Sequence, residues 1–240
     1  MPDNRNTSRS TSIEFSERIA GAISHDFRSS ARQIKSFTQL LEAHLGDDAD
    51  AETEEYLAVL GSAANVLQAK LEALDRFSAK SAGRLKLKEW DLRHIVDGAT
   101  VSIANEVEAA GAVVDIDSSS DAGAKVFVDR ERLIILFVEL FRNSLQFCQK
   151  PARITIRWTN VEHGVLVRVT DSGPGFQAQD YDKAFDLFRT FHLEGQPGAG
   201  TGLAAVRRIL ERHGTSVTIQ SDPAGGTVVQ FTIREVAPCG

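Results

Sequence analysis

Two long apolar stripes with helical spacing, joined by a short polar turn, constrain the fold of this chain more than any other feature. In the first, between about residues 13 and 45, apolar side chains recur at steps of three, four or seven: Ile19, Ile23, Phe27, Ile34, Phe37 and Leu41. Gly46 and the acidic residues after it end the pattern. The second stripe contains Leu57, Leu60, Ala64, Leu67, Leu71 and Leu74. We therefore predict an antiparallel helical hairpin.

Two helices alone cannot bury both stripes. A two-fold dimer, in which two hairpins form a four-helix bundle, would bury them. The alternative is a hairpin that packs on the rest of its own chain. We expect the homodimer, with the hairpin over residues 13–79 as its interface.

Composition excludes several classes of protein. The net charge of −6 gives no support to nucleic-acid binding, and no apolar run has the length of a membrane segment. The two cysteines, Cys148 and Cys239, stand too far apart for a metal or redox motif, and Cys148 is expected to be packed. We expect a cytoplasmic protein, a disordered segment over residues 1–12, and a sensor on a separate protein or upstream domain.

The pattern changes after a small, polar stretch over residues 80–83, which we interpret as a linker. In residues 84–240, alternating strand patterns surround helical patterns at 92–110, 130–147 and 201–213, with Asp91 and Asp129 placed to cap the first two. The predicted strands are 85–87, 113–116, 126–128, 154–158, 165–169, 217–219 and 229–233. The chain as a whole is therefore predicted to be α+β, with a helical hairpin followed by an α/β sandwich whose helices cover one face of a mixed sheet.

His25 and Asp26 stand side by side in the first helical pattern. His25 lies between Ile23 and Phe27 of the apolar stripe, so it turns away from that stripe and faces solvent. An exposed imidazole beside a carboxylate can act as a nucleophile. On these residues alone, an ordinary surface histidine on a solvated helix face is the preferred interpretation, so the meaning of the pair depends on the second part of the chain.

Three stretches of the second part carry candidate binding residues. Glu139 and Asn143 share one helix face, with Gln146 one turn further, and their oxygens suit Mg²⁺ or its waters. Asp171 ends a predicted strand and is followed by Gly173 and Gly175, so it could accept a hydrogen bond from an exocyclic amine. The run from Gly198 to Ala204 opens a helix, where free N–H groups could hold phosphates. It matches neither the P-loop nor the dinucleotide fingerprint.

Together these motifs resemble the sensor histidine kinases of two-component signalling, from about Ser16 to Ile233. Residues 24–28 resemble the phosphoacceptor box, and the helix with Asn143 resembles the asparagine box. Residues 171–175 and 198–203 resemble the two glycine boxes, and Phe185-x-x-Phe188 resembles the phenylalanine box. The hairpin is most similar to that of the phytochrome-like kinases. The resemblance implies an ATP-binding domain of the gyrase, Hsp90, histidine kinase and MutL type.

The resemblance also implies roles for single residues. His25 would accept the γ-phosphoryl group of ATP, Asp26 would orient its ring or take its proton, and Ser29 stands where the family supports phosphatase activity. Asn143 and Glu139 would hold Mg²⁺, and Asp171, supported by Thr227, would accept from the adenine amino group. The nucleotide region would further include Gln146, Gly173, Gly175, Phe188, Gly198, Gly200, Thr201, Gly202 and Leu203. A response-regulator receiver domain would take the phosphoryl group from His25.

Two other functions remain open from the sequence. One is a histidine phosphotransfer protein whose ATP-binding domain is degenerate, because Ser30 replaces a usual proline and Gln146 replaces a usual lysine. The other is an ATPase of the gyrase and Hsp90 class, with Glu139 activating water. That reading leaves the hairpin and His25 unexplained.

Overall fold

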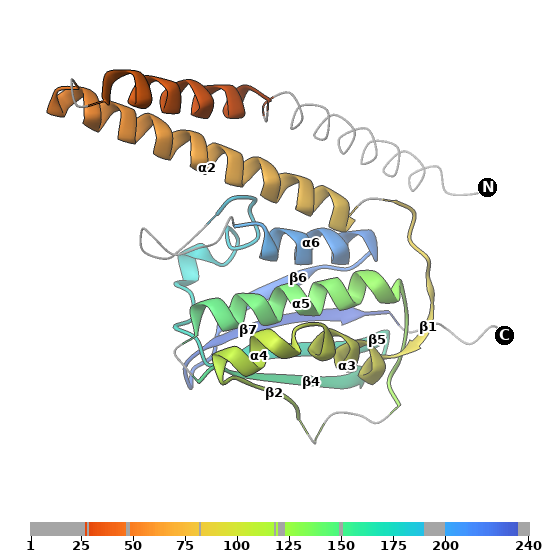
Figure 1. Cartoon of the computed structure of the whole chain (residues 1–240). Coiled ribbons are helices and arrows are strands. Elements are labelled where there is room, and N and C mark those ends of the chain that lie inside the picture. The colour runs from red at the N-terminus through yellow and green to blue at the C-terminus, as the bar shows by residue number, and fades with distance from the viewer. Residues whose placement is uncertain are drawn as a thin grey trace. The chain divides into compact units, whose positions relative to one another are not determined.

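The first part of the chain contains the predicted pair of helices (Figure 1). A computed structural model describes residues 27, 29–46, 49–81, 83–117, 119, 123–148, 151–189 and 200–234. Residues 29–45 form one helix, and α2 (Ala51–Ser81) is the second. Asp50 caps α2 by accepting a hydrogen bond from the Thr53 N–H at 2.8 Å. The predictions for residues 1–12, His25, Asp26 and Gly198 lie outside the described residues.

Each helix of the hairpin has one face against its neighbour and a second apolar face in solvent. The residues buried in this part are small or regularly spaced: Ala31, Thr38, Leu57, Ala64, Leu71 and Ala73. The spacing of seven between Leu57, Ala64 and Leu71 follows the seam of a helix pair. Larger apolar side chains remain exposed on both helices, namely Ile34, Phe37, Leu40, Leu41, Tyr56, Val59, Leu60, Val66 and Leu67. The hairpin thus buries only part of the two stripes.

The second compact unit begins at Gly83 and is built around a five-stranded mixed sheet. The strand order is β2-β4-β5-β7-β6, where only the β2–β4 pair is parallel. The five strands are β2 (Val113–Ile116), β4 (Arg153–Val161), β5 (Gly164–Asp171), β6 (Val217–Ser221) and β7 (Thr227–Ile233). A separate two-stranded antiparallel sheet joins β1 (Lys88–Asp91) to β3 (Lys125–Val128). The predicted mixed sheet is confirmed.

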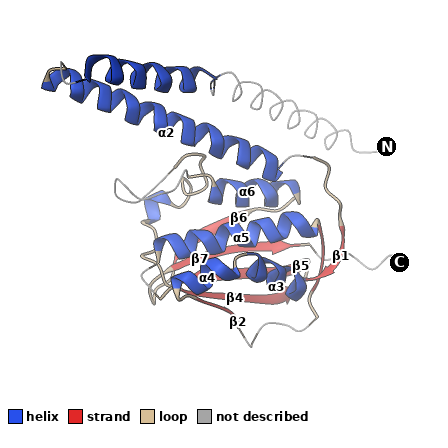
Figure 2. Ribbon diagram, in the orientation of Figure 1, coloured by secondary structure: helices blue, strands red, loops and turns tan. Residues whose placement is uncertain are grey.

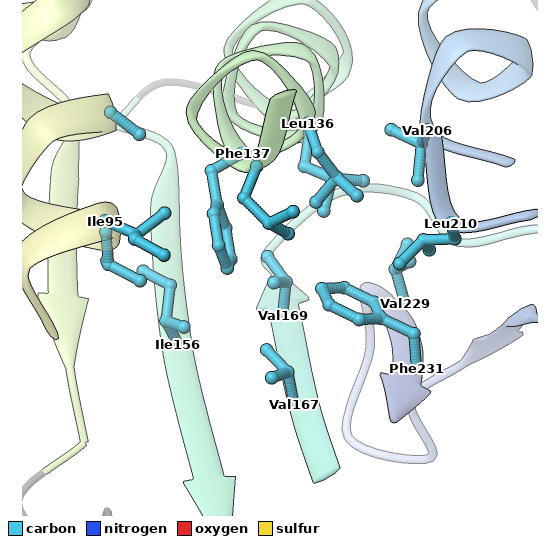
Figure 3. Packing of buried hydrophobic residues seen from close by; sticks show 14 of the residues in the cluster. Ile95, Leu136, Phe137, Ile156, Val167, Val169, Val206, Leu210, Val229 and Phe231 are labelled. Carbon is cyan, nitrogen blue, oxygen red and sulfur yellow. The ribbon is translucent and has the colours of Figure 1, made fainter. Parts of the chain in front are cut away.

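Helices cover one face of the sheet and create a single apolar core with it (Figure 2). They are α3 (Leu92–Ser102), α4 (Ala104–Ala110), α5 (Arg130–Phe147) and α6 (Gly202–Arg212). Alternate strand residues such as Val167 and Val169 meet Phe137 of α5 and Leu210 of α6 in this core (Figure 3). The Phe137 ring lies 6.1 Å from the Phe231 ring, centroid to centroid. The helix α5 is therefore fixed across the centre of the sheet.

Two predictions about local structure need correction. The alternation at residues 85–87 predicted a strand, but β1 comes directly afterwards, at Lys88–Asp91. The Lys86 N–H instead donates to Asp129 Oδ2 at 2.9 Å, which removes it from strand pairing. The predicted helix at 92–110 is interrupted at Ile103, whose φ of −121° and ψ of 16° are not helical. Both expected caps are confirmed, because Asp91 accepts from the Arg93 N–H and Asp129 from the Arg132 N–H.

His213, just after α6, connects that helix to the start of α5. Its Nδ1 lies 2.8 Å from the Ile209 carbonyl oxygen, so Nδ1 carries the proton of the neutral ring. Its Nε2 accepts a hydrogen bond from the Asp129 N–H at 3.1 Å. Burial lowers the pKa of His213 below its ordinary 6.5. The positive charges of Arg212 and Arg132 nearby also lower this pKa, whereas the Asp129 carboxylate raises it. The folded protein therefore favours a neutral His213.

This lowered pKa predicts a loss of stability in mild acid. As the pH falls below 6.5, the unfolded chain binds a proton at His213 before the folded chain does. The free energy of unfolding should therefore decrease from about one pH unit above 6.5 until the pH passes the folded-state pKa. Urea unfolding across this range should show a flatter pH dependence in His213→Gln than in the parent. Equal slopes in the two proteins would contradict the prediction.

Candidate functional site

Asp171 is the centre of the candidate site, and four segments meet at its carboxylate. It is the last residue of β5. Its Oδ1 accepts backbone hydrogen bonds from the Gly173 N–H at 2.8 Å and from the Thr227 N–H at 3.0 Å. Its Oδ2 accepts from Ser144 Oγ of α5 at 3.1 Å. The carboxylate is thus held in one orientation from both neighbouring loops and from the helix above the sheet.

A narrow pocket opens beside this carboxylate. Its walls come from the end of α5, the loop after β5 and the start of β7, and they consist of Asn143, Phe147, Asp171, Gly173, Pro174, Gly175, Phe176 and Thr227. One carboxylate among aromatic and glycine surfaces is typical of a site for a flat heterocycle with an exocyclic donor. The predicted residues Asn143, Asp171, Gly173, Gly175 and Thr227 are therefore brought together. We call this set of eight residues the Asp171 pocket.

Ser221 at the end of β6 holds the loop that follows the glycines. Its Oγ donates to the Phe176 carbonyl oxygen at 2.7 Å and accepts from the Phe176 N–H at 2.8 Å. The Tyr181 hydroxyl in turn accepts from the Ser221 N–H at 3.0 Å, and this bond lowers the pKa of Tyr181. These contacts fix one wall of the Asp171 pocket to the edge strand of the sheet.

The polar residues of α5 do not all face the Asp171 pocket. Asn143 lies in its wall and is half-buried, whereas Gln146 is exposed to solvent. Glu139 of α5 is only 8% exposed, and its Oε2 lies 3.4 Å from the position that a Cβ on Gly202, at the start of α6, would take. Glu139 and Asn143 therefore extend from the start of α6 to the Asp171 pocket. The nucleotide contact expected of Gln146 stays a prediction.

The chain on either side of residues 190–199 is held together by a backbone contact. The Phe188 N–H donates to the Gly200 carbonyl oxygen at 2.8 Å. A Cβ on Gly200 would lie 2.6 Å from the Phe188 carbonyl carbon, so this approach requires glycine. Phe188 itself has a positive φ of 65°, which is unusual for a residue with a side chain. The segment between these two residues therefore has its ends fixed to one another.

The helix α6 begins directly after this contact, at Gly202. Its cap residue, Thr201, makes no side-chain hydrogen bond to the N–H groups of the first turn. Such groups, at the positive end of the helix dipole, can bind an anion. Leu203 points into the hydrophobic core, with Val206, Ile209 and Leu210 further along. Gly200, Thr201 and Gly202 thus lie at the helix start, and Leu203 fixes that start to the sheet.

Cys148 lies behind the Asp171 pocket and is buried. Burial first, and next the negative charge of Asp171, raise the pKa of the Cys148 thiol to about 11. The thiol is therefore protonated at neutral pH and is a poor nucleophile. This confirms the expectation that Cys148 is packed.

The residues present fit ATP with Mg²⁺. Asp171 Oδ1 accepts from two backbone donors and Oδ2 from Ser144 alone, so Oδ2 keeps an acceptor position for a ligand amino group. Across the residues that the structure describes, no three His, Cys, Asp or Glu side chains are grouped to hold a metal ion. Magnesium bound with a nucleotide takes most of its ligands from phosphates and water, and needs one or two protein oxygens. Asn143 and Glu139 can supply those oxygens.

Sequence reasoning missed the residues that shape the Asp171 pocket without a recognisable motif: Ser144, Phe147, Phe176 and Ser221. Ser144 had a detectable signal. It follows Phe137, Leu140 and Phe141 on the buried face of α5, where a hydroxyl requires a partner. Ser221 lies 50 residues from Asp171 in the chain, and no local pattern joins it to Phe176.

Comparison with known proteins agrees with this geometry. Residues 128–237 match the family described as histidine kinase-, DNA gyrase B-, and HSP90-like ATPase. The phytochrome-like protein Cph1 of Synechocystis sp. is 24% identical over 219 residues, which cover 90% of this chain and 29% of Cph1. The methanogenesis regulatory histidine kinase FilI of Methanothrix harundinacea is 29% identical over 90% of this chain and 24% of its own length. The chain thus spans under a third of each relative.

Solved structures show the same fold. Full-length ShkA in complex with AMPPNP has a TM-score of 0.61 and 21% identity, covering 92% of this chain and 47% of that one. Histidine kinase ThkA in complex with the response regulator protein TrrA has a TM-score of 0.61 and 21% identity, covering 97% and 64%. Among the described residues, no helix is both long enough and apolar enough to span a membrane. The residues that match the ATPase family, 128–237, include the Asp171 pocket, and the similarity to the solved structures extends into the hairpin.

Proposed function

We propose, from the premise that this chain carries the catalytic core of a sensor histidine kinase, that it phosphorylates itself on His25 with ATP. The observation that carries the proposal is the Asp171 carboxylate, fixed by two backbone N–H groups and Ser144 within an ATPase domain. That geometry suits recognition of the adenine amino group. The match to histidine kinases over 90% of the chain supports His25 as the acceptor.

Each predicted residue has a role in this proposal. Asp171 accepts from the adenine amino group, while Gly173 and Thr227 hold it by their N–H groups. The start of α6, from Gly200 to Leu203, together with Gly198, contacts the phosphates, and Phe188 fixes the nearby segment. Asn143 and Glu139 hold Mg²⁺, and Gln146 lies toward the phosphates. Bound MgATP supplies the transferable phosphoryl group and the charge neutralisation that phosphoryl transfer requires.

The hairpin supplies the acceptor. A ring nitrogen of His25 attacks the γ-phosphorus, a P–N bond forms, the P–O bond to ADP breaks, and Asp26 takes the ring proton or orients the ring. Residues 80–83 act as the hinge that lets the ATPase domain reach His25. The phosphoryl group then passes to an aspartate of a response-regulator receiver domain. The ThkA–TrrA complex supports such a partner. In the phosphatase reaction, Ser29 would orient a water that hydrolyses the phosphoryl group from the receiver aspartate and releases inorganic phosphate.

Phosphoamino-acid chemistry tests this function. The purified chain is incubated with Mg²⁺ and γ-labelled ATP, and the protein-bound label is then treated with acid or with base. Label that is lost in acid and survives base is phosphohistidine, as the proposal requires. A folded chain that gains no label from ATP would instead favour the phosphotransfer protein with a degenerate ATP-binding domain.

The exposed apolar face of the hairpin supports a homodimer. Phe37, Leu41, Leu60 and Leu67 remain exposed after the two helices have packed on each other, at 65%, 48%, 49% and 37%. Exposed apolar rows of this extent on a helix pair mark an association surface. A second hairpin would bury them in a four-helix bundle. The sensor that controls the kinase is proposed to lie on a separate protein or an upstream domain.

Changing Leu60 and Leu67 together to glutamine should convert the dimer to a monomer. Two leucines in each chain, four per dimer, become polar at the two-fold interface, which removes roughly 2 kcal/mol of hydrophobic stabilisation for each side chain. Sedimentation velocity at micromolar concentration measures the change. Val101→Gln is the matched control, because Val101 is 76% exposed in the ATPase unit and should not affect association. A monomeric parent, or a dimeric double variant, would contradict the prediction.

A further inference from the structure

The two oxygens of the Asp171 carboxylate have unequal numbers of donors. Two backbone N–H groups, those of Gly173 and Thr227, occupy Oδ1. Oδ2 accepts from the Ser144 hydroxyl at 3.1 Å, and the Cys148 thiol adds a weak contact to the same carboxylate. A carboxylate oxygen has about two acceptor positions. Ser144 therefore occupies one position of Oδ2, and a ligand in the Asp171 pocket is limited to the other.

Ser144 is enclosed by protein and has two possible acceptors. Its side chain is only 3% exposed. The Leu140 carbonyl oxygen lies 3.2 Å from Ser144 Oγ, and Asp171 Oδ2 lies 3.1 Å from it. The hydroxyl has one proton for both. Donation to the charged oxygen is the stronger bond, because turning the hydroxyl toward Leu140 would leave its lone pairs against a carboxylate.

We infer that Ser144 is a positioning residue that makes the Asp171 pocket selective for a purine with an exocyclic amino group. This inference rests on the proposed ATP site and deepens it. Ser144 does not contact the nucleotide itself. It fixes the rotation of the Asp171 carboxylate, so that the open acceptor position of Oδ2 points at the ligand amino group. Without the hydroxyl, the carboxylate gains rotational freedom and its bond to the amino group weakens.

A selectivity measurement separates this role from a structural one. Binding of ATP and of purine riboside triphosphate, which has hydrogen in place of the amino group, is measured for the full chain. Ser144→Ala should raise the dissociation constant for ATP about fivefold, the effect of weakening one hydrogen bond to a charged group. The constant for purine riboside triphosphate should change less than about twofold, since that ligand makes no bond to Asp171 Oδ2. The preference for ATP should therefore fall.

The control is Ser102→Ala. Ser102 Oγ donates to the Gly98 carbonyl oxygen at 2.7 Å, so it makes the same contact to the preceding turn as Ser144, on a helix remote from Asp171. This variant should keep the ATP preference of the parent. If Ser144→Ala weakened both triphosphates equally, the residue would be merely structural and the inference would be overturned while the ATP site stood. A folded parent that bound neither triphosphate would overturn the proposed function and this inference together.

Discussion

Replacing Asp171 with asparagine is expected to reduce ATP affinity by about a hundredfold. The variant loses a hydrogen bond to a charged group, and its amide N–H donors lie against the adenine amino group, which is also a donor. The asparagine oxygen can keep the bonds from the Gly173 and Thr227 N–H groups. Its amide nitrogen then takes the place of Oδ2, beside the adenine amino group. The side chain keeps its shape, so the loss reports recognition rather than packing.

Calorimetric titration with ATP measures this loss, with thermal unfolding to confirm that the variant folds. Asp115→Asn is the matched control, because Asp115 is an exposed carboxylate on β2 of the same sheet. It should bind ATP like the parent. Unchanged ATP affinity in a folded Asp171→Asn variant would remove Asp171 from the nucleotide site.

Gly226→Ala is expected to damage both the stability of the second compact unit and the Asp171 pocket. A Cβ at this position would lie 1.9 Å from the Asp171 carbonyl oxygen, and the φ of +108° is one that side chains rarely adopt. Separating the two backbones would disturb the Thr227 N–H bond to the Asp171 carboxylate, because Thr227 directly follows Gly226. We expect a loss of about 3 kcal/mol or more in the free energy of unfolding.

Gly225→Ala separates the two causes. Gly225 also has a positive φ, +98°, but a Cβ there would meet nothing within 4 Å. This control should cost only the backbone strain, about 1 kcal/mol, and should keep ATP binding. Urea unfolding of both variants gives the comparison. Equal losses at the two positions would show that the close approach of Gly226 to Asp171 is unimportant.

The sequence predicted the regular elements well where one local signal acted alone. The caps at Asp91 and Asp129 and the alternation in β5 and β7 all correspond to the structure. The strand at 85–87 was wrong because a long-range contact decided it. Asp129, 43 residues away, takes the Lys86 N–H, and β3 pairs with Lys88–Asp91 instead.

In the candidate site too, residues with a local sequence signal could be predicted and residues placed by long-range contacts could not. Asp171, Gly173 and Gly175 could be found because they follow one strand in a recognisable order. Thr227 was expected to support Asp171, but its contact is a backbone N–H, which the residue type does not encode. Phe147 becomes a pocket wall only when α5 lies across the sheet, and Phe176 only when Ser221 of β6 holds its loop. The position of Phe147 depends on the packing of α5 through Phe137 and Phe141, and not on any local pattern.

The two helices of the hairpin were predictable, but not which residues their pairing buries. Its heptad stripe correctly gave α2, and Leu57, Ala64 and Leu71 form the buried seam. Leu60 and Leu67 belong to the same stripe and remain exposed. A periodic pattern states which residues share a face. It does not state whether the helix beside them or a second chain covers that face.

Locating the phosphoryl group tests the central claim most directly. The parent, His25→Gln, Asp171→Asn and the control His44→Gln are each incubated with MgATP, and peptides are mapped by mass spectrometry at neutral or basic pH. The account predicts one phosphoryl group on His25 in the parent and in His44→Gln, and none in the other two variants. Phosphate on another residue, or on His25 without an intact Asp171, would contradict it.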